Sequence, residues 1–231
     1  MDVELLELYP SPFSERLRWA LETKNVPYRR RNYRPIVDEA ELRQKTGLAT
    51  VPVLFADGDV IGDSNAGVDW LEARHPTPAL LPADPTERAQ VRAFELMATE
   101  TLTPAARLLF IGRCREMNIQ PLADHFTAKY GWSPETEARG ERLLRVALPE
   151  LARAVAARPY LVGGTFTRAD LTVAAMLVVV LGHPPEDLFS LDPSMRSMFG
   201  LPSGGDPALE PLRRWRDDIY RGHRGGQVLP A

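Results

Sequence analysis

A single cysteine, Cys114, is present among the 231 residues of the chain. One thiol cannot form an intrachain disulfide, which is typical of a reducing compartment. No apolar run is long enough to cross a bilayer, and the longest nearly uncharged one, Leu171–Leu181, predicts a buried helix instead. The first residues show no signal-peptide pattern. We therefore expect a cytoplasmic protein with no membrane role.

An excess of positive charge is also missing. The formal net charge is −3 at pH 7, which argues against broad nucleic-acid binding. The one basic run, Tyr28–Arg34, is expected to form the solvated edge of a sheet. The four histidines lack the spacing of zinc ligands, Gly163-Gly164 lacks the lysine of a phosphate loop, and no Gly-x-Ser-x-Gly occurs. We expect no metal cofactor and no nucleic-acid partner.

Apolar alternation and turn residues predict a compact arrangement of short elements in the first third of the chain. The expected elements are a strand at Val3–Tyr9, a helix at Ser14–Lys24, an extended segment at Tyr28–Tyr33, a short helix at Asp38–Lys45, a hairpin of Val51–Phe55 and Val60–Ile61, and a helix from Asp63-Ser64 to about Arg74. This βαβαββα order predicts a small mixed sheet with helices on both faces.

Proline-rich sequence follows the last of these helices and predicts a linker. We therefore divide the chain into an α/β domain at 1–77, a linker at 78–87 and an all-helical domain at 88–231. The expected helices of the second domain run from Thr86 towards Arg113 with a kink at Pro104, from Pro134 to Ala157 with a bend or interruption at Pro149, from Thr167 to Val180, and from Pro207 to Tyr220. The long loop before the last helix is expected to be a lid or an exposed excursion.

The segment Ser11-Pro-Phe-Ser14 stands where the first strand gives way to the first helix. Its spacing is that of a Cys-x-x-Cys redox motif with both sulfurs replaced by hydroxyls. Serine at this place most often caps a helix. The alternative is a site that keeps the geometry of a thiol centre while the sulfur arrives with a ligand.

Four segments, in order and at matching spacing, resemble the motifs of the cytosolic glutathione transferases: SPFSERLRWALETKNVPY, TVPVL, GDSNAGVDWLEARHPTPALLPADPTERA and PYLVGGTFTRADLTVAAML. The resemblance implies a thioredoxin-like N-terminal domain, an all-α C-terminal domain, glutathione as co-substrate and a homodimer. It also identifies Phe166 to Asp170 as a capping box with a hydrophobic staple, in which Phe166 packs near Leu171.

The resemblance assigns roles to residues of the first domain. Ser11 would donate a hydrogen bond to the sulfur of glutathione, with Ser14 in reserve, whereas Tyr9 is expected to pack. Val51-Pro52, through a cis peptide bond, would pair with the cysteinyl part of the tripeptide, and Asp63 and Ser64 would hold its γ-glutamyl end while also capping a helix. The complete set of implied glutathione-binding residues is Phe13, Thr50, Val51, Pro52, Asp63 and Ser64.

The resemblance places the electrophile between the two domains. The residues that would line this second site are Phe13, Ala105, Leu109, Phe110 and Arg113, together with the loop at Met198–Leu201. For each residue taken singly, ordinary core packing is the favoured explanation. An apolar acceptor is the expectation.

Two positions depart from the family pattern. Thr50 stands where the family commonly has Lys or Gln, and Arg34 or Arg43 is a candidate to compensate. Gly67 lies inside a helix where a bulky aliphatic residue is usual, which would be explained by the close approach of another backbone or a ligand.

The sequence leaves three functions open. The first is a detoxifying transferase that uses Ser11 to activate glutathione, and the second is a glutathione-dependent isomerase. The third is a binding or scaffold protein that keeps the fold without the chemistry, which Thr50 and Gly67 support. Ser11 and Ser14 argue directly against a glutaredoxin-type reductase, which needs a redox thiol at this turn.

Overall fold

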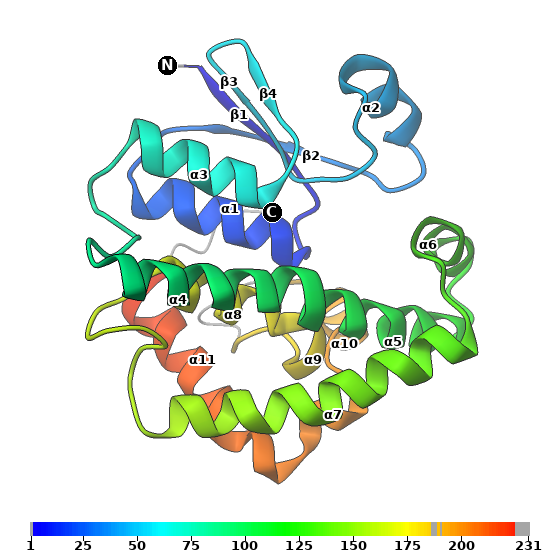
Figure 1. Ribbon diagram of the computed structural model, residues 1–231. Helices are drawn as coiled ribbons and strands as arrows, with labels where there is room; N and C mark the ends of the chain where they lie inside the picture. The colour runs from blue at the N-terminus through cyan, green and yellow to red at the C-terminus, as the bar shows by residue number, and fades with distance from the viewer. Residues whose placement is uncertain (1, 186–188, 190, 225–231) are drawn as a thin grey trace. The chain divides into compact units, whose positions relative to one another are not determined.

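The computed structural model describes residues 2–185, 189 and 191–224, and the chain divides into two compact units, Met1–Leu81 and Pro82–Ala231 (Figure 1). The first unit contains the seven elements that the sequence predicts, in the predicted order. They are β1 (Val3–Glu7), α1 (Pro12–Thr23), β2 (Arg29–Asn32), α2 (Glu39–Thr46), β3 (Val53–Ala56), β4 (Asp59–Ile61) and α3 (Ser64–Arg74).

The four strands form one sheet in the order β2-β1-β3-β4. β1 and β2 are parallel, and the other two pairs are antiparallel. On one face Leu6 lies opposite Val53, and both pack with Tyr33 and with Leu42 of α2. Because side chains alternate along a strand, Leu5 and Leu54 occupy the other face, which α1 and α3 cover side by side (Figure 1).

Gly67 has a packing explanation. A Cβ atom at this position would lie 2.9 Å from both methyl groups of Leu17, so α1 and α3 can approach this closely only without a side chain at Gly67. The close neighbour is therefore a leucine side chain, and the expectation of a backbone or a ligand at Gly67 is wrong.

β2 forms an edge of the sheet, and all four of its residues are exposed. The expected solvated edge is confirmed. One arginine of this exposed strand nevertheless forms an ion pair with a buried residue, because Nε of Arg30 lies 2.5 Å from the carboxylate of Glu7.

Within the described residues, the regular elements of the second unit are all helical. Its helices are α4 (Pro85–Leu96), a π-helical stretch (Met97–Leu102), α5 (Thr103–Glu116), α6 (Leu122–Tyr130), α7 (Pro134–Ala156), α8 (Arg168–Met176), α9 (Val178–Leu181), α10 (Pro193–Met198) and α11 (Glu210–His223), with short 3-10 turns at Pro202–Gly205 and Pro207–Leu209. The end of the predicted second domain, residues 225–231, lies outside the described ranges.

Several details differ from expectation. α4 begins inside the segment predicted as linker, because Asp84 caps it by accepting a hydrogen bond from the N–H of Glu87. The chain stays helical from α4 through a π-helical stretch, which was not anticipated, into α5, and Pro104 follows that stretch directly. α7 runs as one helix through Pro149. α6 was not anticipated, and α10 occupies part of the predicted loop.

α8 is the most buried helix of this unit, as its apolar composition predicts. The capping box is confirmed: Thr167 accepts from the N–H of Ala169, and Asp170 accepts from the N–H of Thr167 at 2.8 Å and from that of Leu161 at 2.7 Å. Burial raises the pKa of Asp170, although these hydrogen bonds oppose the rise. The carboxylate therefore joins the start of α8 to the loop before it.

Phe166, expected near Leu171, stacks on the ring of His223 with centroids 4.1 Å apart. The same imidazole is hydrogen bonded to the hydroxyl of Tyr160 at 3.0 Å. These contacts attach the last turn of α11 to the loop that precedes α8. Among the helices of the described ranges, none has both the length and the apolar composition needed to cross a membrane.

The environment of His223 predicts a pH-dependent stability. Burial lowers the pKa of this imidazole below its ordinary value, so the unfolded chain takes up the proton first as the pH falls. The stabilising contribution is complete above an unfolded pKa of about 6.5 and is lost progressively below it. Urea unfolding between neutral and mildly acidic pH should show a larger loss of stability for the native protein than for His223→Gln. Equal losses in the two proteins would contradict this account.

Candidate active site

The sheet register brings three predicted site segments to one end of the first unit. Leu6 pairs with Val53 and Leu54 pairs with Ile61, both in antiparallel strands. The segment after β1, the segment before β3 and the segment after β4 therefore lie at the same end of the strands. These stretches carry Ser11, the pair Val51-Pro52 and the pair Asp63-Ser64, respectively.

Ser11 occupies the N-cap position of α1 with extended backbone angles, φ −71° and ψ 130°. Its backbone N–H donates to the carbonyl of Leu8 at 2.9 Å, and its carbonyl accepts from the N–H of Glu15 at 2.9 Å. Its half-buried side chain, however, makes no capping hydrogen bond. Capping therefore does not account for the hydroxyl of Ser11. Phe13 lies half-buried in the same first helical turn.

Ser14 has a different role. Its side chain is completely buried, and its hydroxyl accepts a hydrogen bond from the N–H of Leu8 at 3.2 Å. This contact ties the first turn of α1 back to the residue that follows β1. The hydroxyl of Ser14 therefore supports the turn from inside, while that of Ser11 lies on its partly accessible side.

A buried ionic network supports the same turn, and the sequence analysis missed it. Arg18 is completely buried and donates to the buried carboxylates of Glu7 and Glu15 and, at 3.3 Å, to the carbonyl of Tyr9. The ring of Tyr9 lies 4.7 Å from the guanidinium of Arg18 and 5.0 Å from that of Arg30, so Tyr9 packs as expected. The Glu15–Arg18 spacing is compatible with a helical ion pair, but only the fold shows that the pair is buried.

The peptide bond between Val51 and Pro52 is cis, as the resemblance implies, and β3 begins at the next residue. Val51 is half-buried against the core under α2, whereas Thr50 before it is exposed.

The two arginines considered as substitutes for a basic residue at position 50 are both engaged elsewhere. Arg34 binds Asp38 at 2.7 Å, and Arg43 binds Glu39 at 2.9 Å. In both cases the partner lies four residues away along the chain, so each pair is explained by local structure.

The N-terminus of α3 carries the third segment. Asp63 is the N-cap residue, and its exposed carboxylate accepts from the N–H of Asn65 at 2.5 Å, which confirms the predicted capping. Ser64 is buried, and its hydroxyl oxygen lies 3.2 Å from Nη1 of Arg16. The same nitrogen donates to Oδ1 of Asn65 at 2.6 Å. Arg16, a residue of α1, is thus a second functional candidate that sequence reasoning missed.

The four acceptor-site candidates of the second unit divide into two pairs. Ala105 and Leu109 face α7, since a Cβ atom on Gly140 would lie 2.9 Å from the carbonyl oxygen of Ala105 and 3.2 Å from Cδ1 of Leu109. Phe110 and Arg113 instead meet the segment 197–200.

That second contact involves both side chains. The ring of Phe110 stacks on that of Phe199 with centroids 5.4 Å apart. Arg113 donates to the carbonyl of Gly200 and, at 3.3 Å, to that of Ser197. Among the predicted acceptor-site residues, Phe110 and Arg113 therefore connect α5 to the loop that was predicted to line the same site.

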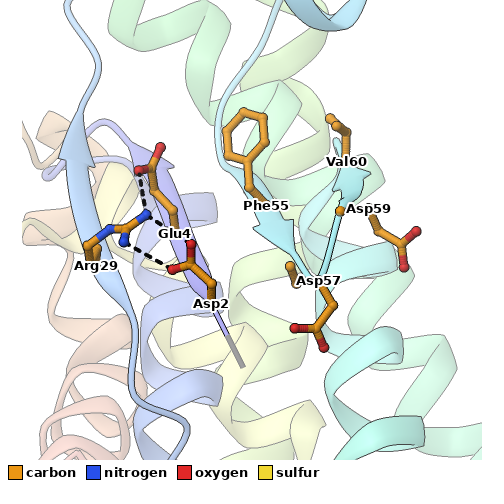
Figure 2. A pocket seen from close by; sticks show the side chains of 9 residues that line it. Asp2, Glu4, Arg29, Phe55, Asp57, Asp59 and Val60 are labelled. Carbon is orange, nitrogen blue, oxygen red and sulfur yellow. Dashed lines mark hydrogen bonds and ion pairs between the residues drawn. The ribbon is translucent and has the colours of Figure 1, made fainter.

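A cavity of about 230 Å³ lies at the other end of the sheet, where β1 begins and β3 turns into β4 (Figure 2). Arg29 binds Asp2 there at 3.0 Å. The residues that line this cavity and are labelled in Figure 2 are Asp2, Glu4, Arg29, Phe55, Asp57, Asp59 and Val60. The cavity contains none of the predicted glutathione-binding residues.

Other chemistry has little support within the described ranges. They contain no group of three or more His, Cys, Asp or Glu residues that could hold a metal ion. Cys114 is buried, and burial raises the pKa of its thiol, so this group is a poor nucleophile at neutral pH.

Comparison with known proteins agrees with this arrangement. The family model for the glutathione S-transferase N-terminal domain matches residues 5–79. A glutathione S-transferase of Methylobacterium radiotolerans, solved with glutathione sulfonate, superposes with a TM-score of 0.64 at 25% identity, over 90% of this chain and 93% of that one. The first unit is a glutathione S-transferase N-terminal domain. The theta-class enzyme of Xanthomonas axonopodis pv. citri, solved with glutathione, shares the fold with a TM-score of 0.70 at 21% identity, over 99% of this chain and 98% of that one.

Among curated relatives, the chain is similar to a probable maleylacetoacetate isomerase of Caenorhabditis elegans. The two are 29% identical over 177 residues, which cover 75% of this chain and 76% of the relative. A maleylpyruvate isomerase of a Ralstonia species is 38% identical over 97 residues, which cover 39% of this chain and 44% of the relative.

The different surroundings of the two serines predict different effects on stability. Ser14→Ala leaves the N–H of Leu8 without its acceptor and should reduce the free energy of unfolding by about 1–3 kcal/mol. Ser11→Ala removes no capping bond and should change it by less than about 0.5 kcal/mol. Urea unfolding of both variants tests this contrast. A larger loss for Ser11→Ala would show that its hydroxyl has a structural role.

Proposed function

We propose that this protein is a glutathione transferase that uses the hydroxyl of Ser11 to stabilise the thiolate of bound glutathione, which then attacks an electrophilic carbon of a small apolar acceptor. The observation that carries the proposal is the contrast at the first turn of α1. The hydroxyl of Ser11 caps nothing and is partly accessible, while that of Ser14 is buried and occupied. Ser11 is therefore the hydroxyl able to meet a ligand.

One hydroxyl suffices energetically. A free thiol has a pKa near ~8.5, and lowering it by about two units requires a preference for the thiolate of roughly 2.7 kcal/mol. A hydrogen bond to a charged group contributes about 1.5–3 kcal/mol, and the N-terminus of a helix adds up to about 1 kcal/mol. Ser11 stands at such an N-terminus. No general base is required.

The neighbouring segments fit the rest of the tripeptide. The γ-glutamyl end of glutathione carries an ammonium and a carboxylate. The exposed carboxylate of Asp63 suits the ammonium, and the first turn of α3 with Ser64 suits the carboxylate. Val51-Pro52, next to Thr50, would present a backbone edge to the cysteinyl residue, with Phe13 close to Ser11 in the chain. The acceptor would contact Phe110 and Arg113, the pair that meets the segment 197–200.

A glutathione-dependent isomerase is the second candidate, and the names of the relatives favour it. Maleylacetoacetate and maleylpyruvate are unsaturated acids with a cis double bond. A thiolate that adds to this bond leaves a single bond that can rotate, and elimination then restores the double bond in the trans form and releases the thiolate. The same Ser11–sulfur contact would serve this reaction, with no net consumption of glutathione.

The scaffold alternative has lost part of its support. Gly67 is explained by Leu17, so only Thr50 still argues for a lost glutathione site. A homodimer in the cytoplasm and a role in detoxification remain proposals that rest on the family resemblance.

Replacement of Ser11 tests the proposal. Ser11→Ala should lower turnover with a model electrophile about ten- to a hundredfold, because it removes about 1.5–3 kcal/mol of thiolate stabilisation. Spectrophotometric titration should show the pKa of bound glutathione rising towards ~8.5, with nearly unchanged affinity. Tyr9→Phe serves as the control for a phenol-type site and should leave both properties unchanged. Normal turnover in Ser11→Ala would refute the assignment.

The two reactions differ in their use of glutathione. With maleylacetoacetate or maleylpyruvate as substrate, an isomerase should convert many equivalents of acid while the free thiol concentration stays constant. A transferase should lose one thiol for each acceptor consumed. Proton NMR of the product together with thiol titration distinguishes these outcomes. Absence of turnover with either acid would exclude the isomerase for these substrates.

A further inference from the structure

Arg16 is a charged side chain with no exposed surface, placed between two helices of the first unit. It belongs to α1, and its Nη1 atom reaches the first turn of α3, at 3.2 Å from Oγ of Ser64 and 2.6 Å from Oδ1 of Asn65. Withdrawing a guanidinium from water is costly, so its position must be compensated by specific contacts. These two contacts fix the side chains that open α3.

The contact with Arg16 sets the direction of the Ser64 hydroxyl. A guanidinium can only donate, so Oγ of Ser64 acts as the acceptor and its own proton must point elsewhere. Among the described residues that proton meets no acceptor, although the side chain is only 3% exposed. A buried donor without an acceptor is unfavourable unless a ligand supplies one.

The backbone of the first turn of α3 also favours a ligand that accepts hydrogen bonds. The first N–H groups of a helix have no acceptor within the helix, and Asp63 satisfies that of Asn65. The remaining donors, the helix dipole and the directed hydroxyl of Ser64 all favour an acceptor-only anion such as a carboxylate. The positive charge of Arg16 lies one hydrogen bond behind them.

We propose that Arg16 is a positioning residue that prepares the N-terminus of α3 to receive the α-carboxylate of the γ-glutamyl residue of glutathione, without touching the ligand itself. This inference rests on the proposed function, because it deepens the binding step of the same site. Arg16 orients the donor of Ser64 and holds Asn65. Its loss should therefore weaken recognition of one carboxylate and leave the chemistry at the sulfur intact.

The test compares two ligands by calorimetry on the full-length protein. The ligands are glutathione and 4-aminobutanoyl-cysteinylglycine, which is glutathione without the α-carboxylate of its γ-glutamyl residue. The native protein should prefer glutathione about ten- to a hundredfold. In Arg16→Met the affinity for glutathione should fall by a similar factor while that for the truncated ligand hardly changes. KM for glutathione should rise, and kcat at saturation should stay the same.

Matched variants separate positioning from general stability. Arg168→Lys alters a buried arginine outside the site, which belongs to α8 and pairs with Glu95, and it should keep the preference for glutathione. Ser64→Ala should lose the preference, and adding Arg16→Met to it should lower discrimination little further, because both changes act on one contact. Arg16→Lys keeps the charge and allows the comparison if Arg16→Met does not fold.

The outcomes are distinct. Equal losses of affinity for both ligands in the Arg16 variants, or an unchanged preference, would overturn the inference and leave the proposed function standing. No binding of glutathione by the native protein would overturn the proposed function, and the inference with it. Loss of the preference in the Arg16 and Ser64 variants, with retention in Arg168→Lys, would support it.

Discussion

The turn between β1 and α1 is held by buried polar contacts on its inner side, and the rest of the site depends on that support. Ser14 accepts the N–H of Leu8, and Arg18 joins Glu7 at the end of the strand to Glu15 in the helix. Buried charges are tolerated only when they are paired and hydrogen bonded, so this network favours one geometry of the turn. On the same turn the hydroxyl of Ser11 makes no capping hydrogen bond within the part of the chain that the structure describes.

Two buried arginines on one helix divide the support of the site between them. Two residues that are two positions apart on a helix are related by a rotation of about 200° around the helix axis, so their side chains point to nearly opposite sides. Arg18 accordingly binds the strand and the turn, while Arg16 crosses to the first turn of α3. Gly67 allows this crossing because α1 and α3 approach closely at Leu17. The sulfur end and the carboxylate end of the proposed ligand are thus supported by neighbouring residues of one helix.

In the second unit, the buried helix α8 contributes stability. Helix α5 carries Phe110 and Arg113, which are candidate contacts for the acceptor. α8 is anchored by its capping box and by the ion pair of Arg168 with Glu95, at 3.0 Å, in which both side chains are buried. α5 holds the segment 197–200 through Phe110 and Arg113. Relatives named as isomerases and relatives named as transferases both match this chain, so the fold alone does not decide the acceptor.

The sequence by itself determined the order of elements in the first unit and the helix caps at Asp63 and Thr167, although it placed the start of α1 at Ser14 instead of Pro12. Apolar alternation, Asp57-Gly58 at the hairpin and caps such as Asp63 and Thr167 act over a few neighbouring residues, so their patterns can be read directly. Only the tertiary structure decided that Ser14 supports the turn, that Gly67 faces Leu17, and that Arg16 meets Ser64, which lies 48 residues away. The partners of a buried polar group depend on sheet register and helix packing, and these long-range contacts leave no local pattern.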